Sequence, residues 1–280
     1  MTRGFDALHI GPQKSATTWL YRCLSEHPGV SVAKTDEVHF LDIHFHRGLP
    51  WLTAQFEEDA GSRLRIDMTS SYLRSPLAPE RAWAVNPDAR VILCLRDPVE
   101  RAFSHYWHEK KKLRFDYTFE ECLENYDLFT SWVEPGLYAL HASRWVQAFG
   151  RERVLMQDFA HLRRDPAAFL AEALDFLGLP LGSEPSVLNS KVNEARPPGR
   201  KRAKALRRAV ERSPLGPLAV RMARALRRPQ TATGRRMERL EDVDPAVIAA
   251  LREIFEPDIC ALEELAGRAL PQLRRARPHE

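Results

Sequence analysis

The octapeptide from Gly11 to Thr18 has the residue types of an anion-binding loop. It lies between a mostly apolar run, residues 5–10, and a segment whose apolar residues have helical spacing. Unpaired backbone N–H groups at a helix N-terminus attract anions, and the helix dipole adds to the attraction. The loop supplies one lysine and three hydroxyls, at Lys14, Ser15, Thr17 and Thr18. The alternative is an ordinary strand-to-helix turn with a solvated lysine.

This loop differs from the Walker loop of nucleotide-binding kinases. The second glycine of G-x-x-x-x-G-K-[ST] is missing, and Lys14 comes three residues after Gly11. A kinase that uses ATP also needs a Mg²⁺-binding carboxylate after a strand, and Asp97 could supply it. Such a kinase is therefore one alternative function, but its Gly-Lys-Ser/Thr step is absent.

A second group of polar residues follows the buried-strand pattern of residues 90–95. Arg96 comes at the carboxyl end of this predicted strand, where open α/β sheets bind ligands. Pro98 is suited to the first turn of a helix that we expect to reach about residue 112. On that helix Arg101 and Ser104 share a face. The alternative is a surface ion pair between Arg96 and Asp97 beside an inert Ser104.

A third group, residues 37–42, contains two carboxylates and an imidazole. If this segment is extended, Glu37 and His39 point to the same face. A carboxylate and an imidazole on one face can remove a proton from an attacking hydroxyl. The alternative is a solvated Glu37 with His39 packed into a wall of the protein.

Together these motifs resemble those of the sulfotransferases that use 3′-phosphoadenosine 5′-phosphosulfate (PAPS). Residues 11–18 are similar to the family's 5′-phosphosulfate loop, G-x-x-[KR]-[ST]-[GA]-[ST]-[ST], and residues 96–106 to R-D-P-x-x-R-x-x-S-x-Y. Residues 37–42, Glu-Val-His-Phe-Leu-Asp, resemble E-V-H-F-F-D of the heparan sulfate glucosaminyl O-sulfotransferases.

The resemblance implies transfer of a sulfuryl group from PAPS to a hydroxyl, or to an amine as the second candidate, with release of PAP and without a metal. The acceptor is a small molecule, a sugar or a lipid. Arg96 and Ser104 would bind the 3′-phosphate. Glu37 would be the general base, assisted by His39 and Asp42, and Tyr138 would contact nucleotide or acceptor. The 5′-phosphate would be held by Lys14, which is also catalytic, and by Ser15, Ala16, Thr17 and Thr18.

One position departs from the family. Residues 66–72 align with the family stretch E-K-[ST]-x-x-Y, and the lysine that lies near the transferring sulfuryl group is Met68 here. A positive charge is therefore absent unless another side chain replaces it.

The elements that must position these motifs alternate between strand and helix patterns. Strand patterns at residues 5–10, 65–67, 90–95 and 153–157 are separated by helical spacing after Thr17, after Pro98 and at 139–149. This alternation predicts an α/β fold with a central parallel sheet, and the resemblance makes it a P-loop-like three-layer sandwich. Asp244-Pro245 begins a last helix, which we expect to end near residue 266 and to form a helical C-terminal part.

Length and composition favour one domain. The 280 residues are 44% hydrophobic, and we divide them into an α/β core (5–195), a basic segment (196–241) and a C-terminal helix with its tail (242–280). No apolar run is long enough to span a bilayer, and the first ten residues have a strand pattern and no signal-peptide pattern, so we predict a cytoplasmic protein. The four cysteines are scattered, which favours neither zinc nor disulfides.

The basic segment has fifteen Lys or Arg against three Glu, although the whole chain has a net charge of only +4. It could be a solvated surface, attract a polyanionic donor or acceptor, or dock on an anionic membrane. A non-enzymatic anion- or membrane-binding protein is therefore the second alternative function. Nucleic-acid binding has little support, because no aromatic residue interleaves with the charges.

Overall fold

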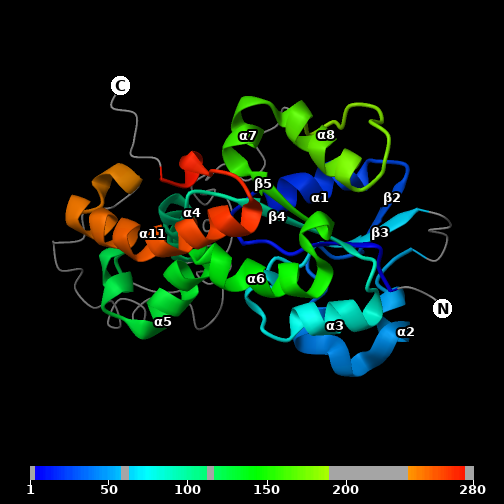
Figure 1. Ribbon diagram of the computed structural model, residues 1–280, viewed down its shortest axis with the longest axis horizontal. Coiled ribbons are helices and arrows are strands. Elements are labelled where there is room, and N and C mark those ends of the chain that lie inside the picture. The colour runs from blue at the N-terminus through cyan, green and yellow to red at the C-terminus, as the bar shows by residue number, and fades with distance from the viewer. Residues whose placement is uncertain (1–3, 58–62, 112–116, 189–238, 275–280) are drawn as a thin grey trace, which may run out of the picture.

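The computed structural model describes residues 4–57, 63–111, 117–188 and 239–274. Its centre is one five-stranded sheet made of β1 (Ala7–His9), β2 (Val30–Val32), β3 (Leu64–Asp67), β4 (Arg90–Leu95) and β5 (Val154–Asp158). All neighbouring strands are parallel, in the order β2-β3-β1-β4-β5 (Figure 1). Because β3 and β4 both pair with β1, the segments that leave these three strands emerge side by side at the carboxyl edge.

The helices connect the strands and extend the fold beyond the sheet. Those of the α/β part are α1 (Thr17–Ser25), α2 (Gly48–Thr53), α3 (Ala78–Val85), α4 (Pro98–Lys111), α5 (Tyr126–Leu128), α6 (Tyr138–Phe149), α7 (Phe159–Arg164) and α8 (Pro166–Phe176). The last long helix is α11 (Pro245–Ala266). Its N-terminus is capped by Asp244, whose side chain accepts from the N–H of Ala246.

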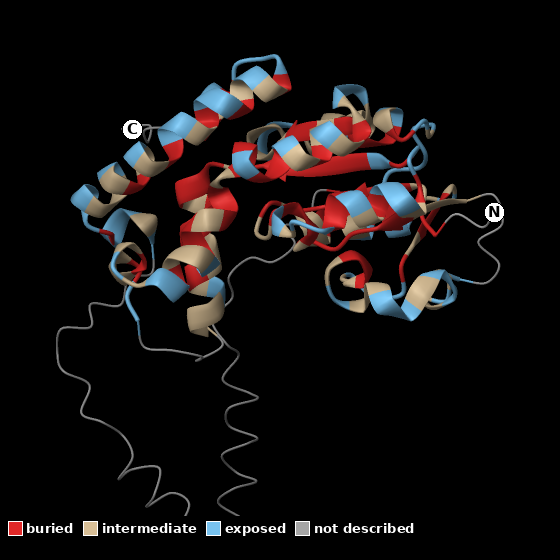
Figure 2. Ribbon diagram, turned by 60° about the horizontal axis from the view of Figure 1, so that its bottom comes forward, coloured by how far each residue is buried: buried red, intermediate tan, exposed pale blue. Residues whose placement is uncertain are grey.

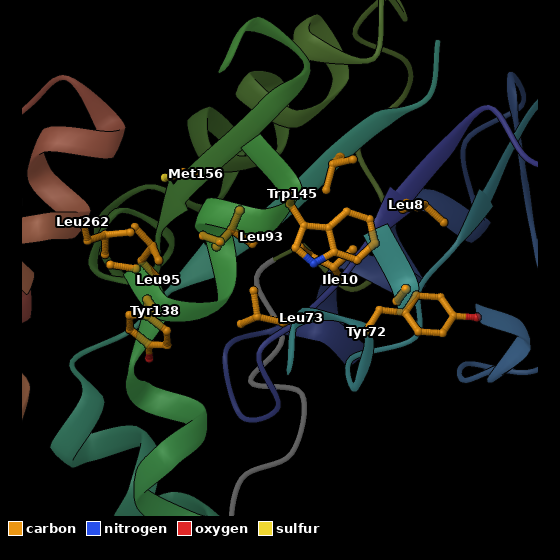
Figure 3. Packing of buried hydrophobic residues seen from close by; sticks show 14 of the residues in the cluster. Leu8, Ile10, Tyr72, Leu73, Leu93, Leu95, Tyr138, Trp145, Met156 and Leu262 are labelled. Carbon is orange, nitrogen blue, oxygen red and sulfur yellow. The ribbon is translucent and has the colours of Figure 1, made fainter. Parts of the chain in front are cut away.

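Helices cover both faces of the sheet, and the side chains of β4 alternate between them. Ile92 and Cys94 pack into an apolar cluster with α1 and α8 on one face. Leu93 and Leu95 pack into a larger cluster with α4, α6 and α11 on the other face, where Figure 3 shows Leu93 near Trp145 and Leu95 near Tyr138. The strands are buried between helices whose outer sides are exposed (Figure 2). The predicted α/β sandwich with a helical C-terminal part is confirmed.

Several elements differ from the sequence-based expectations. Strand β2 and helix α3 were not predicted, since three residues and eight residues carry little periodicity. Strand β4 has the predicted bounds, whereas the run at 5–10 contributes only Ala7–His9 as strand.

Most of the basic segment, residues 196–238, lies outside the described residues, as does the tail at 275–280. The division into core, basic segment and C-terminal helix, and membrane docking by the basic segment, therefore stay predictions. No helix in the described parts of the chain is both long and apolar enough to cross a membrane.

Candidate active site

The loop between β1 and α1 has the backbone geometry of an anion-binding turn. Lys14 and Ala16 have left-handed backbones, with φ of 73° and 66°. Left-handed residues in a turn bring successive N–H groups to one concave side, as in anion-binding nests. The Ser15 hydroxyl is buried and has no hydrogen-bond partner in the described structure. Because a buried donor without a partner is unfavourable, this hydroxyl fits a site that is completed by a bound anion.

Gly11 brings the same loop against the chain that leaves β3. A Cβ atom added at Gly11 would collide with the backbone carbonyl oxygen of Ser70, and the glycine also has a φ of +104°. Only glycine permits both the left-handed backbone and this close approach. The contact therefore fixes the distance between the anion-binding loop and the segment that follows β3.

Arg96 joins the loop to the end of β4. Its Nη1 donates a hydrogen bond to the Lys14 carbonyl oxygen at 3.0 Å, and its guanidinium lies 4.8 Å from the ring centre of Phe159. The guanidinium also forms an ion pair of 3.3 Å with Glu100. Arg96 thus stabilises the loop by a hydrogen bond to its backbone and places a guanidinium group beside it.

The expected contact between Tyr138 and nucleotide or acceptor does not fit its position. Tyr138 is completely buried, and its hydroxyl donates to the Arg96 carbonyl oxygen at 2.8 Å. Figure 3 shows the ring within the apolar cluster, near Leu95. The hydroxyl thus supports the end of β4, and Tyr138 is not among the residues that line the pocket described below.

Asp97 has a structural role at the start of α4. Its Oδ1 accepts from the N–H groups of Val99 and Glu100, both at 3.0 Å, and its Oδ2 lies 2.6 Å from Arg252 on α11. The surface Arg96–Asp97 pair is therefore not formed. A carboxylate committed in this way is also poorly placed to hold Mg²⁺, which removes the feature that favoured a kinase.

Ser104 and His105 lie two turns into α4. Ser104 is half-buried, and no hydrogen bond of its side chain is found among the described residues. Burial lowers the pKa of His105 to about 3, helped by the positive charges of Arg101 and Lys14. This imidazole is therefore neutral near pH 7, and the shift indicates a positive field around the helix.

On the other side of the loop, Glu37, His39 and Asp42 form a chain of contacts. His39 Nε2 lies 3.4 Å from Glu37 Oε2, and its Nδ1 lies 3.2 Å from Asp42 Oδ2. The exposed fraction of the side chain is 36% for Glu37, 29% for His39 and 15% for Asp42. An imidazole between two carboxylates can take up or pass on a proton, and the outermost carboxylate is open to a substrate.

The residues after β3 hold this chain in place. The Ser70 hydroxyl donates to Glu37 Oε1, and the Ser71 hydroxyl donates to Asp42 Oδ2 at 2.6 Å. Neither serine was predicted as a site residue. The signal that could have found them is a run of three hydroxyl residues, 69–71, which begins two residues after the end of a strand that pairs with β1.

Residues 37–42 are not extended, although Glu37 and His39 do meet. His39 has a left-handed backbone with φ of 55°, and a single turn follows at Phe40–His44. Thr69 stabilises this bend, because its Oγ1 accepts from the N–H groups of Val38 and His39 at 2.8 and 3.2 Å. The Thr69 side chain, from the segment after β3, therefore binds the backbone of residues 38 and 39 and stabilises the bend.

Asp67 lies beneath this arrangement at the end of β3. It accepts the hydroxyls of Thr69 at 2.7 Å and Tyr72 at 2.8 Å. Burial raises the pKa of Asp67 to about 6 against the lowering effect of these two hydrogen bonds. The aspartate thus anchors the threonine that bends the Glu37 segment.

A pocket of about 200 Å³ lies between the start of the loop and the segment that follows β3. Met68 does not face it, since its side chain is buried in the cluster with α1 and α8. Two arginines contribute to the pocket, which is lined by Pro12, Gln13, Ser70, Ser71, Leu73, Arg74, Arg101 and Pro135.

Comparison with known proteins gives a consistent family match. Residues 5–196 match the model of the sulfotransferase domain. Over 199 residues the chain is 34% identical to the bifunctional heparan sulfate N-deacetylase/N-sulfotransferase 4 of Mus musculus, a match that covers 61% of this chain and 22% of that protein. It is also 34% identical over 180 residues to heparan sulfate glucosamine 3-O-sulfotransferase 3B1 of Mus musculus, covering 62% of this chain and 46% of that protein. The chain thus matches less than half the length of either relative.

A solved structure shares the fold. The crystal structure of a sulfotransferase from Alicyclobacillus acidocaldarius superposes with a TM-score of 0.67 at 24% identity, covering 98% of this chain and all of the other. The parallel sheet and the helical C-terminal part are thus common to both chains.

Proposed function

We propose that this chain, which belongs to the sulfotransferase domain family, is a sulfotransferase enzyme with PAPS as its donor and a hydroxyl as its acceptor. An amine is the second candidate, since the relatives include both N- and O-sulfotransferases by name. The acceptor molecule is a small molecule, a sugar or a lipid. A cytoplasmic location stays a prediction.

One observation carries this proposal: the anion-binding loop and the Glu37–His39–Asp42 chain meet at the contact between Gly11 and Ser70. Donor phosphates on the loop would therefore lie beside a carboxylate that is open to a second substrate. Neither half alone supports group transfer, because a loop without a base only binds and a base without a donor has no group to move.

In the proposed reaction the acceptor oxygen attacks sulfur in line with the leaving phosphate oxygen. The new bond joins that oxygen to sulfur, the bond from sulfur to the 5′-phosphate oxygen breaks, and the acceptor proton moves to Glu37. Asp42 orients His39, and His39 stabilises the Glu37 carboxylate before the transfer. After the transfer, His39 can share the proton that Glu37 has taken up. Lys14 stabilises the charge that develops on the leaving phosphate, so catalysis rests on positioning and electrostatics.

In this proposal each of the two nucleotide motifs binds one phosphate group of the donor. Lys14, Ser15, Ala16, Thr17 and Thr18 would hold the 5′-phosphate through N–H groups, hydroxyls and one ammonium. Arg96 and Ser104 would hold the 3′-phosphate, which distinguishes PAPS from ATP. The proximity of Arg96 to the Lys14 carbonyl supports a continuous donor site.

Calorimetry with PAP and ATP tests the donor. We expect PAP to bind in the micromolar range and ATP much more weakly, because only PAP has a 3′-phosphate for Arg96. Equal affinities for the two nucleotides would contradict the assignment. A thermal melt should agree, since a ligand that binds only the folded state raises the midpoint.

Turnover of PAPS against a panel of alcohols, sugars, amines and glycolipids tests the reaction and identifies the acceptor. The expected result is release of PAP together with a mass gain of one sulfuryl group on at least one compound. PAP release without a labelled product would indicate hydrolysis and leave the transfer unsupported.

A further inference from the structure

Arg101 on α4 is the most unusual charged side chain in the described structure. It is completely buried, and its Nη2 donates to the backbone carbonyl oxygen of Trp132. Its Nε and Nη1 are also buried, and neither has a hydrogen-bond partner among the described residues. Two donors of one guanidinium are therefore left without acceptors.

No carboxylate forms an ion pair with Arg101 within the described parts of the chain. The attraction from Glu134 is outweighed by burial, and Glu134 itself forms an ion pair of 3.2 Å with His141. Burial lowers the pKa of Arg101 to about 10, so the guanidinium remains charged at neutral pH. A buried charge without a counter-ion is strongly unfavourable, which indicates that an anion completes this site.

Arg101 lines the pocket between the start of the anion-binding loop and the segment after β3. Arg74 lines the same pocket from Tyr72–Arg74, and no Asp or Glu is among its described lining residues. Ser70, which donates to Glu37, forms part of the wall. None of the residues assigned to the donor phosphates, at 14–18, 96 and 104, lines it. The pocket therefore has two positive side chains and no described carboxylate, and Ser70 connects its wall to Glu37.

We propose that this pocket binds one oxyanion beside Glu37, a sulfonate, sulfate or carboxylate, with Arg101 as the main contact and Arg74 at the rim. The proposal rests on the proposed function, because the pocket is lined by the start of the donor loop and by Ser70, the hydrogen-bond donor to Glu37. The anion is either the sulfonate that is transferred or an acidic group of the acceptor.

Sulfate binding to the PAP-saturated protein is the direct test. With PAP on the donor phosphate sites, sodium sulfate is titrated at constant ionic strength and its heat is measured. The wild-type protein should bind one sulfate. Arg101→Met should weaken this binding at least tenfold, Arg101→Lys should retain part of it, and Arg74→Met should weaken it less. The matched control is Arg164→Met, which removes an exposed arginine outside the pocket.

PAP binding by the same variants separates this proposal from the proposed function. Unchanged PAP affinity shows a folded protein with an intact donor site, so a loss of sulfate binding then belongs to the pocket. If Arg101→Met does not fold, Arg101→Lys and Arg74→Met carry the test. If wild-type protein binds no sulfate, or both arginine positions can be changed without effect, the proposal is overturned while the donor assignment stands.

Competition distinguishes the two sources of the anion. If the pocket holds the transferred sulfonate, PAPS without acceptor should displace sulfate, whereas PAP should not. If it holds an acceptor group, methyl glucuronide should displace sulfate from the PAP complex, and methyl glucoside, which lacks the carboxylate, should not. Displacement by neither would mean an adventitious ion only and would overturn the proposal.

Discussion

The donor half and the acceptor half of the candidate site are built in different ways. The donor half is mainly backbone: two left-handed residues, a glycine in close contact and a carbonyl held by Arg96 define the loop. The acceptor half is mainly side chain: Glu37, His39 and Asp42 are held by hydroxyls from the segment after β3.

This difference corresponds to two chemical tasks. A phosphate group is recognised by fixed N–H groups that need no proton transfer, so backbone geometry is sufficient. Removing a proton requires titratable groups with some freedom to reach a substrate. We therefore expect changes in the donor half to affect binding as well as rate, and changes in the acceptor half to affect rate alone.

Glu37→Gln should have the largest effect on turnover. The amide keeps the size and some hydrogen bonding but cannot take a proton, and loss of a general base lowers rates about 10²–10⁴-fold. PAP affinity, measured by calorimetry, should change little. Glu184→Gln, an exposed position outside the site, is the matched control.

His39→Ala decides the roles within the acceptor half. If this variant is inactive while Glu37→Gln turns over normally, the imidazole is the base and the assignment is reversed. If both variants lose PAP binding, the segment belongs to the donor site or to the fold, and the contrast between the two halves fails.

Lys14→Ala should lower the rate by about 10²-fold or more, because it removes the charge that stabilises the leaving phosphate. Unlike the acceptor-side variant, it should also weaken PAP binding. Lys14→Arg retains the charge and should recover part of both. A folded Lys14→Ala protein with wild-type turnover would contradict the assignment of the loop.

The two halves also contain buried groups whose effects on stability have opposite signs in acid. Under the donor loop, burial lowers the pKa of His9 from 6.5 to about 4, so acid protonates the unfolded chain first and stability falls as the pH drops from 6.5 to 4. Under the acceptor segment, the pKa of Asp67 rises from 3.8 to about 6, so the folded state takes up its proton first and stability rises as the pH drops from 6 to 3.8.

Across its whole pH range, each of these groups changes the free energy of unfolding by an amount on the order of 3 kcal/mol. Denaturant unfolding between pH 4 and pH 7 measures them. His9→Leu should reduce the loss of stability in acid, whereas Asp67→Asn should make that loss steeper. The same pH dependence in both variants as in wild type would show that neither group titrates as expected.

The smallest effect is expected for Glu100→Gln in the donor half. Glu100 pairs with Arg96 and would repel the 3′-phosphate, so its removal should raise PAP affinity about two- to fivefold, within the range of exposed ion pairs. Adenosine 5′-phosphosulfate, which lacks that phosphate, should gain less in the same calorimetric experiment. An equal gain for both ligands would place Arg96 away from the 3′-phosphate.

The sequence predicted the donor half more completely than the acceptor half. β4, α4 and the helix after the loop carry their signals locally, as an apolar run, a first-turn proline and helical spacing. The loop's chemistry is contained in eight consecutive residues. Such features can be predicted from the sequence because the interactions that form them link residues close in the chain.

Tertiary structure decided the rest. Ser70 meets Glu37 across 33 positions, and Tyr138 meets the Arg96 carbonyl across 42. Hydroxyl side chains and a buried tyrosine have no periodic signal that identifies such distant partners. The bend at His39 depends on Thr69. The pocket at Arg101 is formed by segments that are far apart in the sequence, at residues 12–13, 70–74, 101 and 135. The sequence therefore determined which groups are available for sulfuryl transfer, and the packing of parallel strands determined which of them meet.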